Sequence, residues 1–183
     1  MTKVVLLVLV VGIVAGAFLV VNETSPPWYE RLRYPLHYAA DVRVHARENE
    51  LDPALLAAVI ESESKFDANA ESSSGAIGLM QLTPSTAKGI AIRTGGSAFR
   101  TADLYDPEIN IRYGAWYLRN LFRKYGSERL VLAAYNAGQG NVDRWRRSGQ
   151  SVQFPETRAY VDRVEKLKGI YRDAWGKQLG LAR

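Results

Sequence analysis

The segment from Asp52 to Phe66 reads DPALLAAVIESESKF and carries the clearest structural signal in the chain. Asp52 can cap a helix because its side chain accepts hydrogen bonds from the first unpaired backbone N–H groups. Pro53 suits the first helical position, where the N–H that proline lacks is not needed. An unbroken apolar run follows. We therefore predict a helix from Pro53 to Ser62 or Glu63, with an apolar face in the core.

Within this helix, Glu63 occupies a position where the pattern calls for an apolar side chain. Each residue of an α-helix is rotated by about 100° about the helix axis from the one before it. With Leu55 set at zero, the large apolar residues have a mean direction of about 70° on this wheel. Glu63 lies at about 80°, within the apolar face, and Glu61 at about 240°, on the opposite side. A carboxyl group on an apolar face must be paired, or its pKa must rise until it stays protonated near neutral pH. A raised carboxyl pKa suits a general acid. The periodicity fits equally well a glutamate at a fraying helix end that reaches solvent or an arginine.

Other helices are expected on both sides of this one. Thr83-Pro84 and Asp106-Pro107 repeat the combination of a capping residue and a proline, and Ser127 can cap a further helix that stops at Gly138. No alternating run typical of a strand is present, and only the Gly/Ser-rich stretch 68–82 has room for a short β ribbon. We predict an all-α domain over 38–183. Its expected helices, besides 53–63, cover 38–49, 84–91, 107–125, 127–138 and 155–175.

The composition excludes several kinds of chemistry. The 183 residues include no cysteine, which excludes a disulfide scaffold, a cysteine-based zinc site and a thiol nucleophile. In one helix, His37 and His45 would lie about 12 Å apart, too far to share a metal ion. We assign both a structural or solvated role and expect no metal and no cofactor. Any catalysis then falls to carboxylates, hydroxyls and amides.

The N-terminal segment predicts a membrane anchor. Residues 4–21 carry no polar side chain, and as a helix they would measure about 27 Å, close to the hydrocarbon thickness of a bilayer. Lys3 before them favours a cytoplasmic N-terminus, with the domain on the periplasmic or outer side of the inner (cytoplasmic) membrane. The alternative is a cleaved signal peptide, since Ala15-Gly16-Ala17 has the pattern of a cleavage site. The apolar run continues beyond that site, which favours an uncleaved anchor.

Residues 22–37 follow as a predicted linker that includes Pro26 and Pro27. The chain has a formal net charge of +5, and the segment 144–147 reads RWRR. A basic cluster around an aromatic residue can indicate nucleic-acid binding. An anchor that places the domain outside the cytoplasm favours a solvated helix face or a contact with glycan, so we expect no nucleic-acid partner.

Two further segments carry candidate site residues. In GAIGLMQ, residues 75–81, two glycines beside apolar residues indicate a backbone that closely approaches another strand or a ligand. Tyr135 and Asn136 fall in the last turn of a predicted helix before Gly138. Alone, they favour ordinary packing and capping.

Taken together, these segments resemble the catalytic domain of the soluble lytic transglycosylases, the SLT family. The departures are Ala68, where many members have proline, and Thr83, where many have methionine; both are peripheral. The matching blocks keep the family's order and approximate spacing between residues 45 and 172, and they are ESKF at 63–66, GAIGLMQ at 75–81, TPSTA at 83–87, YGAWYL at 113–118, AYNAGQG at 134–140 and ETRAYV at 156–161.

The resemblance implies a lysozyme-like fold and cleavage of the β-1,4 bond between MurNAc and GlcNAc of peptidoglycan, with a 1,6-anhydroMurNAc product. Glu63 matches the family's catalytic acid and base, and Ser72 a position that contacts substrate near the reacting sugar. Tyr135 matches the tyrosine beside that glutamate, Asn136 supports its turn, and Glu156 matches an acidic residue at the groove edge. The groove-lining residues that the resemblance implies are Gly78, Leu79, Met80 and Gln81.

Three functions fit these observations. The first is a membrane-anchored lytic transglycosylase whose partners are peptidoglycan glycan strands and the membrane. The second is a hydrolytic muramidase of the same fold, in which water replaces the sugar's own hydroxyl group. The third is a non-catalytic module that binds peptidoglycan, and Glu63 argues against it because a binder needs no carboxyl group on an apolar face. Protein partners are not indicated.

Overall fold

The structure of the chain is a computed structural model that describes residues 7, 11, 12, 16, 26–96 and 98–181. It divides into two units, Met1–Pro35 and Leu36–Arg183. The first unit contains α2, Pro27–Arg33, within the stretch that we predicted as a linker. Among the described residues, no helix is both long enough and apolar enough to span a bilayer. The predicted anchor over 1–21 lies almost wholly outside the described residues.

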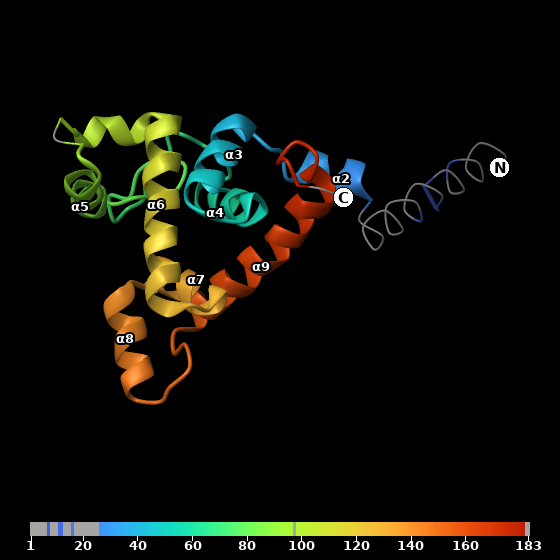
Figure 1. Cartoon of the computed structure of the whole chain (residues 1–183). Helices are drawn as coiled ribbons and strands as arrows, with labels where there is room; N and C mark the ends of the chain where they lie inside the picture. Colours follow the sequence, from blue (N-terminus) through green and yellow to red (C-terminus); the bar gives the residue numbers. More distant parts are fainter. Residues whose placement is uncertain (1–6, 8–10, 13–15, 17–25, 97, 182–183) are drawn as a thin grey trace. The chain divides into compact units, whose positions relative to one another are not determined.

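In its described residues, the second unit contains helices and no strand (Figure 1). In place of the ribbon considered for 68–82 there are two isolated bridges, which pair Ile77 with Glu71 and with Leu82. The predicted all-α class is confirmed. The elements in chain order are α3 Ala39–Glu48, α4 Pro53–Ser64, α5 Pro84–Thr94, the 3-10 helix η1 Thr101–Tyr105, α6 Pro107–Tyr125, α7 Glu128–Ala137, α8 Gln139–Arg147 and α9 Pro155–Trp175.

The caps act largely as their sequence predicts. The side chains of Asp52, Thr83 and Asp106 each accept a hydrogen bond from a backbone N–H in the first turn of the helix that follows. Ser127 stands at the N-cap of α7, but its side chain makes no capping hydrogen bond. Helix α8, nine residues long, follows α7 after Gly138 alone and was not predicted from the sequence. Its nine residues include only two large apolar side chains, Val142 and Trp145, and so small an apolar content gives little evidence of a helix.

Helix α4 is buried on all sides. The seven residues from Ala54 to Ile60 are each at most 1% exposed. The prediction of one apolar face was therefore incomplete, because a helix that is apolar all round lies inside a core rather than on its surface. Glu61, which we expected on the exposed side, is half-buried and accepts a hydrogen bond from the Tyr171 hydroxyl at 3.2 Å.

Helices α6 and α9 connect the two ends of this unit. In Figure 1, α3, α4 and α5 lie near one end of α6, whereas α7 and α8 lie near the other. Helix α9 packs against both α7 and α4. This path brings residues from the first half of α9 to the end of α4, where Glu63 lies.

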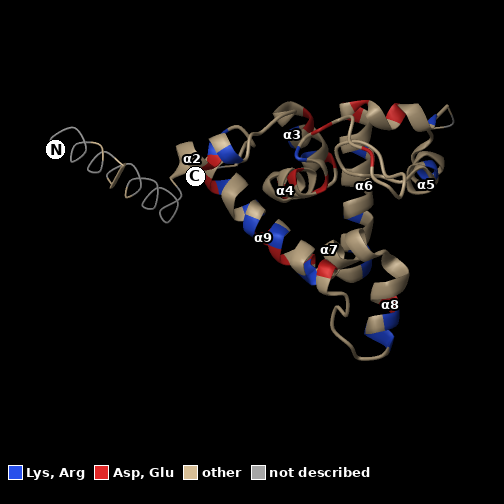
Figure 2. Ribbon diagram, turned by 180° about the vertical axis from the view of Figure 1, so that it is seen from behind, with Lys and Arg blue, Asp and Glu red and all other residues tan. Residues whose placement is uncertain are grey.

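Positively and negatively charged residues follow one another along α9 (Figure 2). Lys168 Nζ lies 2.7 Å from Glu128 Oε2 and 3.5 Å from Asp52 Oδ2, so this one cation links α9 to α7 and to the cap of α4. Partly exposed ion pairs contribute only about 0–1 kcal/mol each. The stability of the arrangement therefore comes mainly from apolar burial.

His45 and Trp145 are buried, whereas His37 and the three arginines of the RWRR segment are exposed. His45 is buried, with Nδ1 2.9 Å from Glu48 and Nε2 3.2 Å from Glu108, and it thereby links α3 to α6. The His37 ring packs edge-on against Phe66 with 6.0 Å between centroids. Trp145 is 5% exposed, so the aromatic residue of the basic cluster belongs to the core.

Candidate active site

Glu63 lies in the last turn of α4, where burial changes its acidity. Its Oε1 accepts a hydrogen bond of 2.6 Å from the Tyr160 hydroxyl of α9. Removal from water raises the pKa of Glu63 to about 7, although the Tyr160 hydrogen bond and the positive charge of Arg163 both act to lower it. At neutral pH, the carboxyl group is therefore close to half protonated.

The Tyr160 hydrogen bond determines which oxygen carries the acidic proton. Because Oε1 accepts from Tyr160, a protonated Glu63 holds its proton on Oε2. Within the described part of the chain, Oε2 has no hydrogen-bond partner. Glu63 thus has one oxygen held by Tyr160 and another that no described residue contacts by a hydrogen bond.

Two tyrosines surround Glu63 as neutral groups. Burial, and next the negative charge of Glu63, raise the pKa of both the Tyr135 and the Tyr160 hydroxyl well above the usual value of tyrosine. Tyr135 donates its hydroxyl proton to the Met80 carbonyl at 2.7 Å, and its ring lies 5.6 Å from that of Tyr117 on α6. Tyr135 therefore holds the loop after α4 through the Met80 carbonyl, whereas Tyr160 holds the carboxyl group of Glu63.

Arg163 holds the start of α9 against the end of α4. Its Nε donates to Ser62 Oγ at 2.9 Å, and its guanidinium lies over the Tyr160 ring at 5.5 Å. The cation is thus close enough to limit the rise of the Glu63 pKa without forming an ion pair with it. A direct pair would favour the charged form of Glu63, and the carboxyl group would then be largely ionised at neutral pH.

The loop that follows α4 is held by one buried amide. Asn110 is fully buried; its Oδ1 accepts from the Met80 N–H at 2.8 Å, and its Nδ2 donates to the carbonyls of Ile77 at 2.9 Å and Leu104 at 2.8 Å. Ser64, beside Glu63, donates to the Leu79 carbonyl at 2.8 Å. Asn110 was not predicted as a site residue, although an asparagine between two isoleucines in an amphipathic helix is a usable signal.

The predicted groove residues differ in their exposure. Leu79 and Met80 are 0% exposed, and Gly78 is also buried, so the side chains of this segment support the site from within the core. Gln81 is half-buried, and its Nε2 donates to the carbonyls of Ala70 at 3.1 Å and Gly78 at 3.0 Å. The contact of this segment with substrate stays a prediction.

The other predicted site residues lie around these. Ser72 is half-buried in a turn, where its Oγ accepts from the Ala76 N–H and lies 2.9 Å from Ser74 Oγ. Asn136 is exposed, and its Oδ1 accepts from the Thr157 hydroxyl at 2.8 Å, which ties the end of α7 to the start of α9. Glu156 is exposed and lies four residues before Tyr160, about one turn away on the same face of α9.

Glu61 is a second carboxyl group in the same helix with a raised pKa. Burial is the main cause, and the Tyr171 hydrogen bond and the charge of Lys65 oppose it. Glu61 and Glu63 contact different parts of α9, because Tyr171 and Tyr160 are about 16 Å apart along that helix. Within the described residues, no second carboxyl group shares the contacts of Glu63.

The comparison with known families agrees with this arrangement. The family model described as "Transglycosylase SLT domain" matches residues 42–156. The chain belongs to this family. The predicted resemblance is confirmed, and with it the lysozyme-like fold.

Similar proteins cover most of this SLT chain. The soluble lytic murein transglycosylase of Salmonella typhimurium is 31% identical over 161 residues, which are 81% of this chain and 25% of the relative. The lytic transglycosylase Slt of Pseudomonas aeruginosa, solved as an inactive mutant with glutamine in place of a glutamate, superposes with a TM-score of 0.74 at 33% identity over 84% of this chain and 26% of its own. The 70-kDa SLT70 of Escherichia coli gives a TM-score of 0.75 at 30% identity, over 84% of this chain and 27% of its own. The chain thus spans about a quarter of the length of these relatives.

Proposed function

We propose that this SLT domain is a peptidoglycan lytic transglycosylase that cleaves the β-1,4 bond between MurNAc and GlcNAc. The observation that carries the proposal is one carboxyl group, Glu63, with a pKa raised to about 7 and one oxygen that has no hydrogen-bond partner among the described residues. The names of its relatives support the same activity, and so does the glutamate-to-glutamine exchange of the inactive Pseudomonas aeruginosa relative.

In the first step, Glu63 acts as a general acid. Its Oε2 proton passes to the bridging oxygen, the bond from that oxygen to the anomeric carbon of MurNAc breaks, and GlcNAc leaves with a new hydroxyl group. The acetamido carbonyl of MurNAc assists departure at the anomeric carbon. Tyr160 holds Oε1 throughout, and its hydrogen bond strengthens as Glu63 becomes charged.

In the second step, Glu63 acts as a base. The carboxylate accepts the proton of the MurNAc C6 hydroxyl, whose oxygen attacks the anomeric carbon and closes the 1,6-anhydro ring. Ordinary glycosidases need a second carboxylate as nucleophile or to activate water. Here the nucleophile belongs to the substrate, so one carboxyl group is sufficient. A pKa near the working pH suits a group that must serve in both forms.

The products of purified peptidoglycan test this function. We expect muropeptides that end in 1,6-anhydroMurNAc, each lighter by one water molecule than the corresponding reducing end, and mass spectrometry distinguishes the two. Reducing ends alone would identify a hydrolytic muramidase and contradict the intramolecular second step. Binding to peptidoglycan without any product would favour the non-catalytic module.

Replacement of Tyr160 by phenylalanine is expected to shift the pH profile. Loss of the hydrogen bond to the charged form should raise the pKa of Glu63 further, because that bond opposes the effect of burial. An acid works below its pKa, so the alkaline limb of kcat/KM should move above its wild-type midpoint near pH 7. The rate at the optimum should fall about tenfold, since Glu63 loses the contact that orients it.

A matched control for this variant is Tyr171→Phe, which removes the same hydroxyl group from the same helix beside Glu61. It should leave the midpoint of the alkaline limb unchanged. A Tyr160→Phe profile that coincides with the wild-type profile would show that Tyr160 does not set the acidity of Glu63.

We further propose that residues 4–21 anchor the domain in the cytoplasmic membrane, with the catalytic unit on the outer side. Support comes from the length of the apolar run, from Lys3 before it, and from the location of peptidoglycan outside the cytoplasm. In alkaline extraction of membranes, an anchored chain stays in the pellet, whereas release of a shorter chain would indicate a cleaved signal.

A further inference from the structure

Helix α2, Pro27–Arg33, presents two adjacent apolar side chains to solvent. Trp28 is 61% exposed and Leu32 is 78% exposed. Residues four positions apart lie one above the other on the same face of a helix, so the two side chains form one apolar patch. Glu30 is rotated by about half a turn from Trp28 and is buried. The apolar patch is therefore on the side of α2 that the described residues leave uncovered.

The residues around this apolar patch are those that favour a lipid interface. Arg31 and Arg33 lie in the last turn of α2 and are exposed, whereas Glu30, the one acidic residue of this helix, is buried. Tyr29 is half-buried, and its ring meets that of Trp28 edge-on with 5.9 Å between centroids. Tryptophan and tyrosine prefer the level of the lipid headgroups, and arginine can keep its charge there while its methylene groups contact apolar atoms. The exposed side of α2 therefore matches the boundary between headgroups and acyl chains.

The length of the chain before α2 limits its distance from a bilayer. The apolar run of the sequence ends at Val21 and α2 begins at Pro27, so only the five residues 22–26 separate them. Even when fully extended, this connection spans only about 20 Å. With residues 4–21 in the bilayer, as proposed above, α2 is held within this distance of the membrane surface. Such a short tether gives an effective concentration in the millimolar range, so a helix of seven residues needs little membrane affinity of its own.

We propose that α2 lies in the membrane interface, with Trp28 and Leu32 inserted between the lipid headgroups. Arg31 and Arg33 then pair with headgroup phosphates, so the partner of this face is the anionic outer surface of the bilayer. The inference rests on the proposed anchor and adds a second attachment to it. Leu36, the first residue of the catalytic unit, follows α2 after two residues, so this attachment keeps the catalytic unit near the membrane. Cleavage is then confined to glycan strands close to the bilayer.

A fluorophore at position 32 tests this contact directly. The chain has no cysteine, so Leu32→Cys in the full-length chain takes a single bimane label. Ile92→Cys is the matched control, because Ile92 lies on α5 of the catalytic unit and is 74% exposed. Each labelled chain is reconstituted into vesicles of phosphatidylcholine and phosphatidylglycerol, with or without a lipid that carries a nitroxide on its acyl chain near the headgroup. An interfacial helix buries its apolar face by about 5–10 Å, so we expect the nitroxide to quench the label of Leu32→Cys about fivefold more than that of Ile92→Cys.

The outcomes separate this inference from the proposed anchor. A chain that does not float with the vesicles after an alkaline wash contradicts the anchor and this inference together. A chain that floats while the two labels are quenched equally leaves the anchor in place and overturns this inference alone. A blue-shifted emission from Leu32→Cys without quenching would mean that protein rather than lipid covers the apolar patch, and it would overturn the inference as well.

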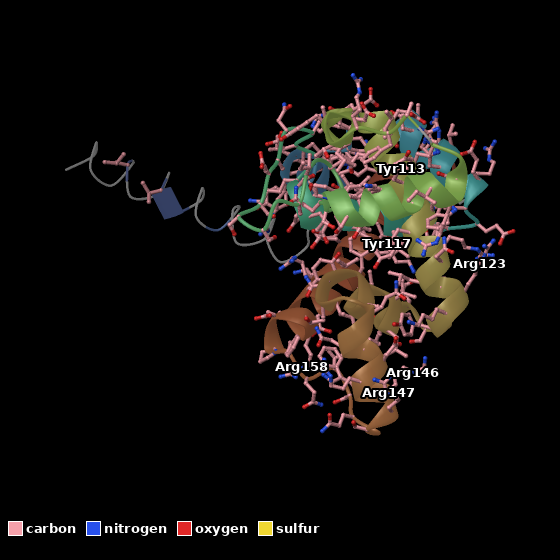
Figure 3. All side chains as sticks on the ribbon, turned by 90° about the vertical axis from the view of Figure 1, so that its left-hand side faces the viewer. Tyr113, Tyr117, Arg123, Arg146, Arg147 and Arg158 are labelled. Atoms are coloured by element: carbon pink, nitrogen blue, oxygen red, sulfur yellow. The ribbon has the colours of Figure 1, made fainter. Side chains whose placement is uncertain are left out.

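Two further substitutions in the labelled Leu32→Cys chain separate the apolar patch from a general effect of charge. Trp28→Ser should reduce the quenching about twofold, because the larger apolar side chain of the patch is lost. Arg147→Gln should leave it unchanged. Arg147 lies with Arg146 in the last turn of α8, where both are exposed and form a basic surface of the catalytic unit (Figure 3). Equal losses in the two variants, or no loss with Trp28→Ser, would show that the apolar patch does not bring the label to the lipid, and would overturn the proposal.

Discussion

Glu63→Gln is expected to reduce the cleavage of peptidoglycan by at least about a thousandfold. Glutamine preserves the shape of the side chain but neither donates an acidic proton nor accepts one, and general acid–base catalysis contributes about 10²–10⁴ in rate. Glu63 serves in both proposed steps, so both are lost together. The measurement is the initial rate of muropeptide release from purified peptidoglycan. Activity within tenfold of wild type would remove Glu63 from the mechanism.

Glu63→Gln should also change how the free energy of unfolding depends on pH. The same measurement shows whether the variant is folded. The pKa of Glu63 is about 7 in the folded chain against an ordinary 4.5, so folding favours the protonated form. The wild type should therefore lose stability as pH rises from 4.5 to 7, by on the order of 3 kcal/mol in full. Glutamine does not titrate. Below pH 4.5 the two proteins should have similar free energies of unfolding, and above pH 7 the variant should be the more stable.

Much of the fold follows from local signals in the sequence. A capping side chain and a proline act within one helical turn, so Asp52 and Asp106 mark the starts of α4 and α6 whatever packs around them. Glu63 follows from a local signal as well, because a carboxyl group that interrupts an apolar pattern within one helix needs no knowledge of other helices. The match of several motif blocks then gives the family.

The contacts that tune the site are not local. Tyr160 and Glu63 are 97 positions apart, and their hydrogen bond depends on the path of α9 back to α4. The sequence of α9 alone does not say which residue the Tyr160 hydroxyl reaches. The burial of α4 on every side also depends on this path. For the same reason, Glu61 is half-buried although its own helix predicts exposure.

Gly78→Ala, in the loop that follows α4, is expected to lower the stability of the protein strongly. Gly78 has a φ of +78°, and a Cβ there would lie 2.3 Å from both Asn110 Nδ2 and the Leu104 carbonyl oxygen. Neither neighbour can move easily, because Asn110 is held by three hydrogen bonds and the carbonyl accepts one of them. We expect a loss of about 3–4 kcal/mol and a Tm lower by about 10 °C. Thermal unfolding followed by circular dichroism measures both.

The chain offers a control that separates the two causes of this loss. Gly75 has nearly the same backbone conformation, with a φ of +77°, but a Cβ there meets nothing within 4 Å. Gly75→Ala should therefore cost only the backbone strain, about 1 kcal/mol, and the difference in stability between the two variants measures the steric conflict with Asn110 and Leu104.

Because Asn110 also holds the Met80 segment that Tyr135 contacts, Gly78→Ala should lower activity even where the protein is folded. Equal stability of the two variants would show that the loop yields at Gly78, and that Asn110 does not fix the position of the site.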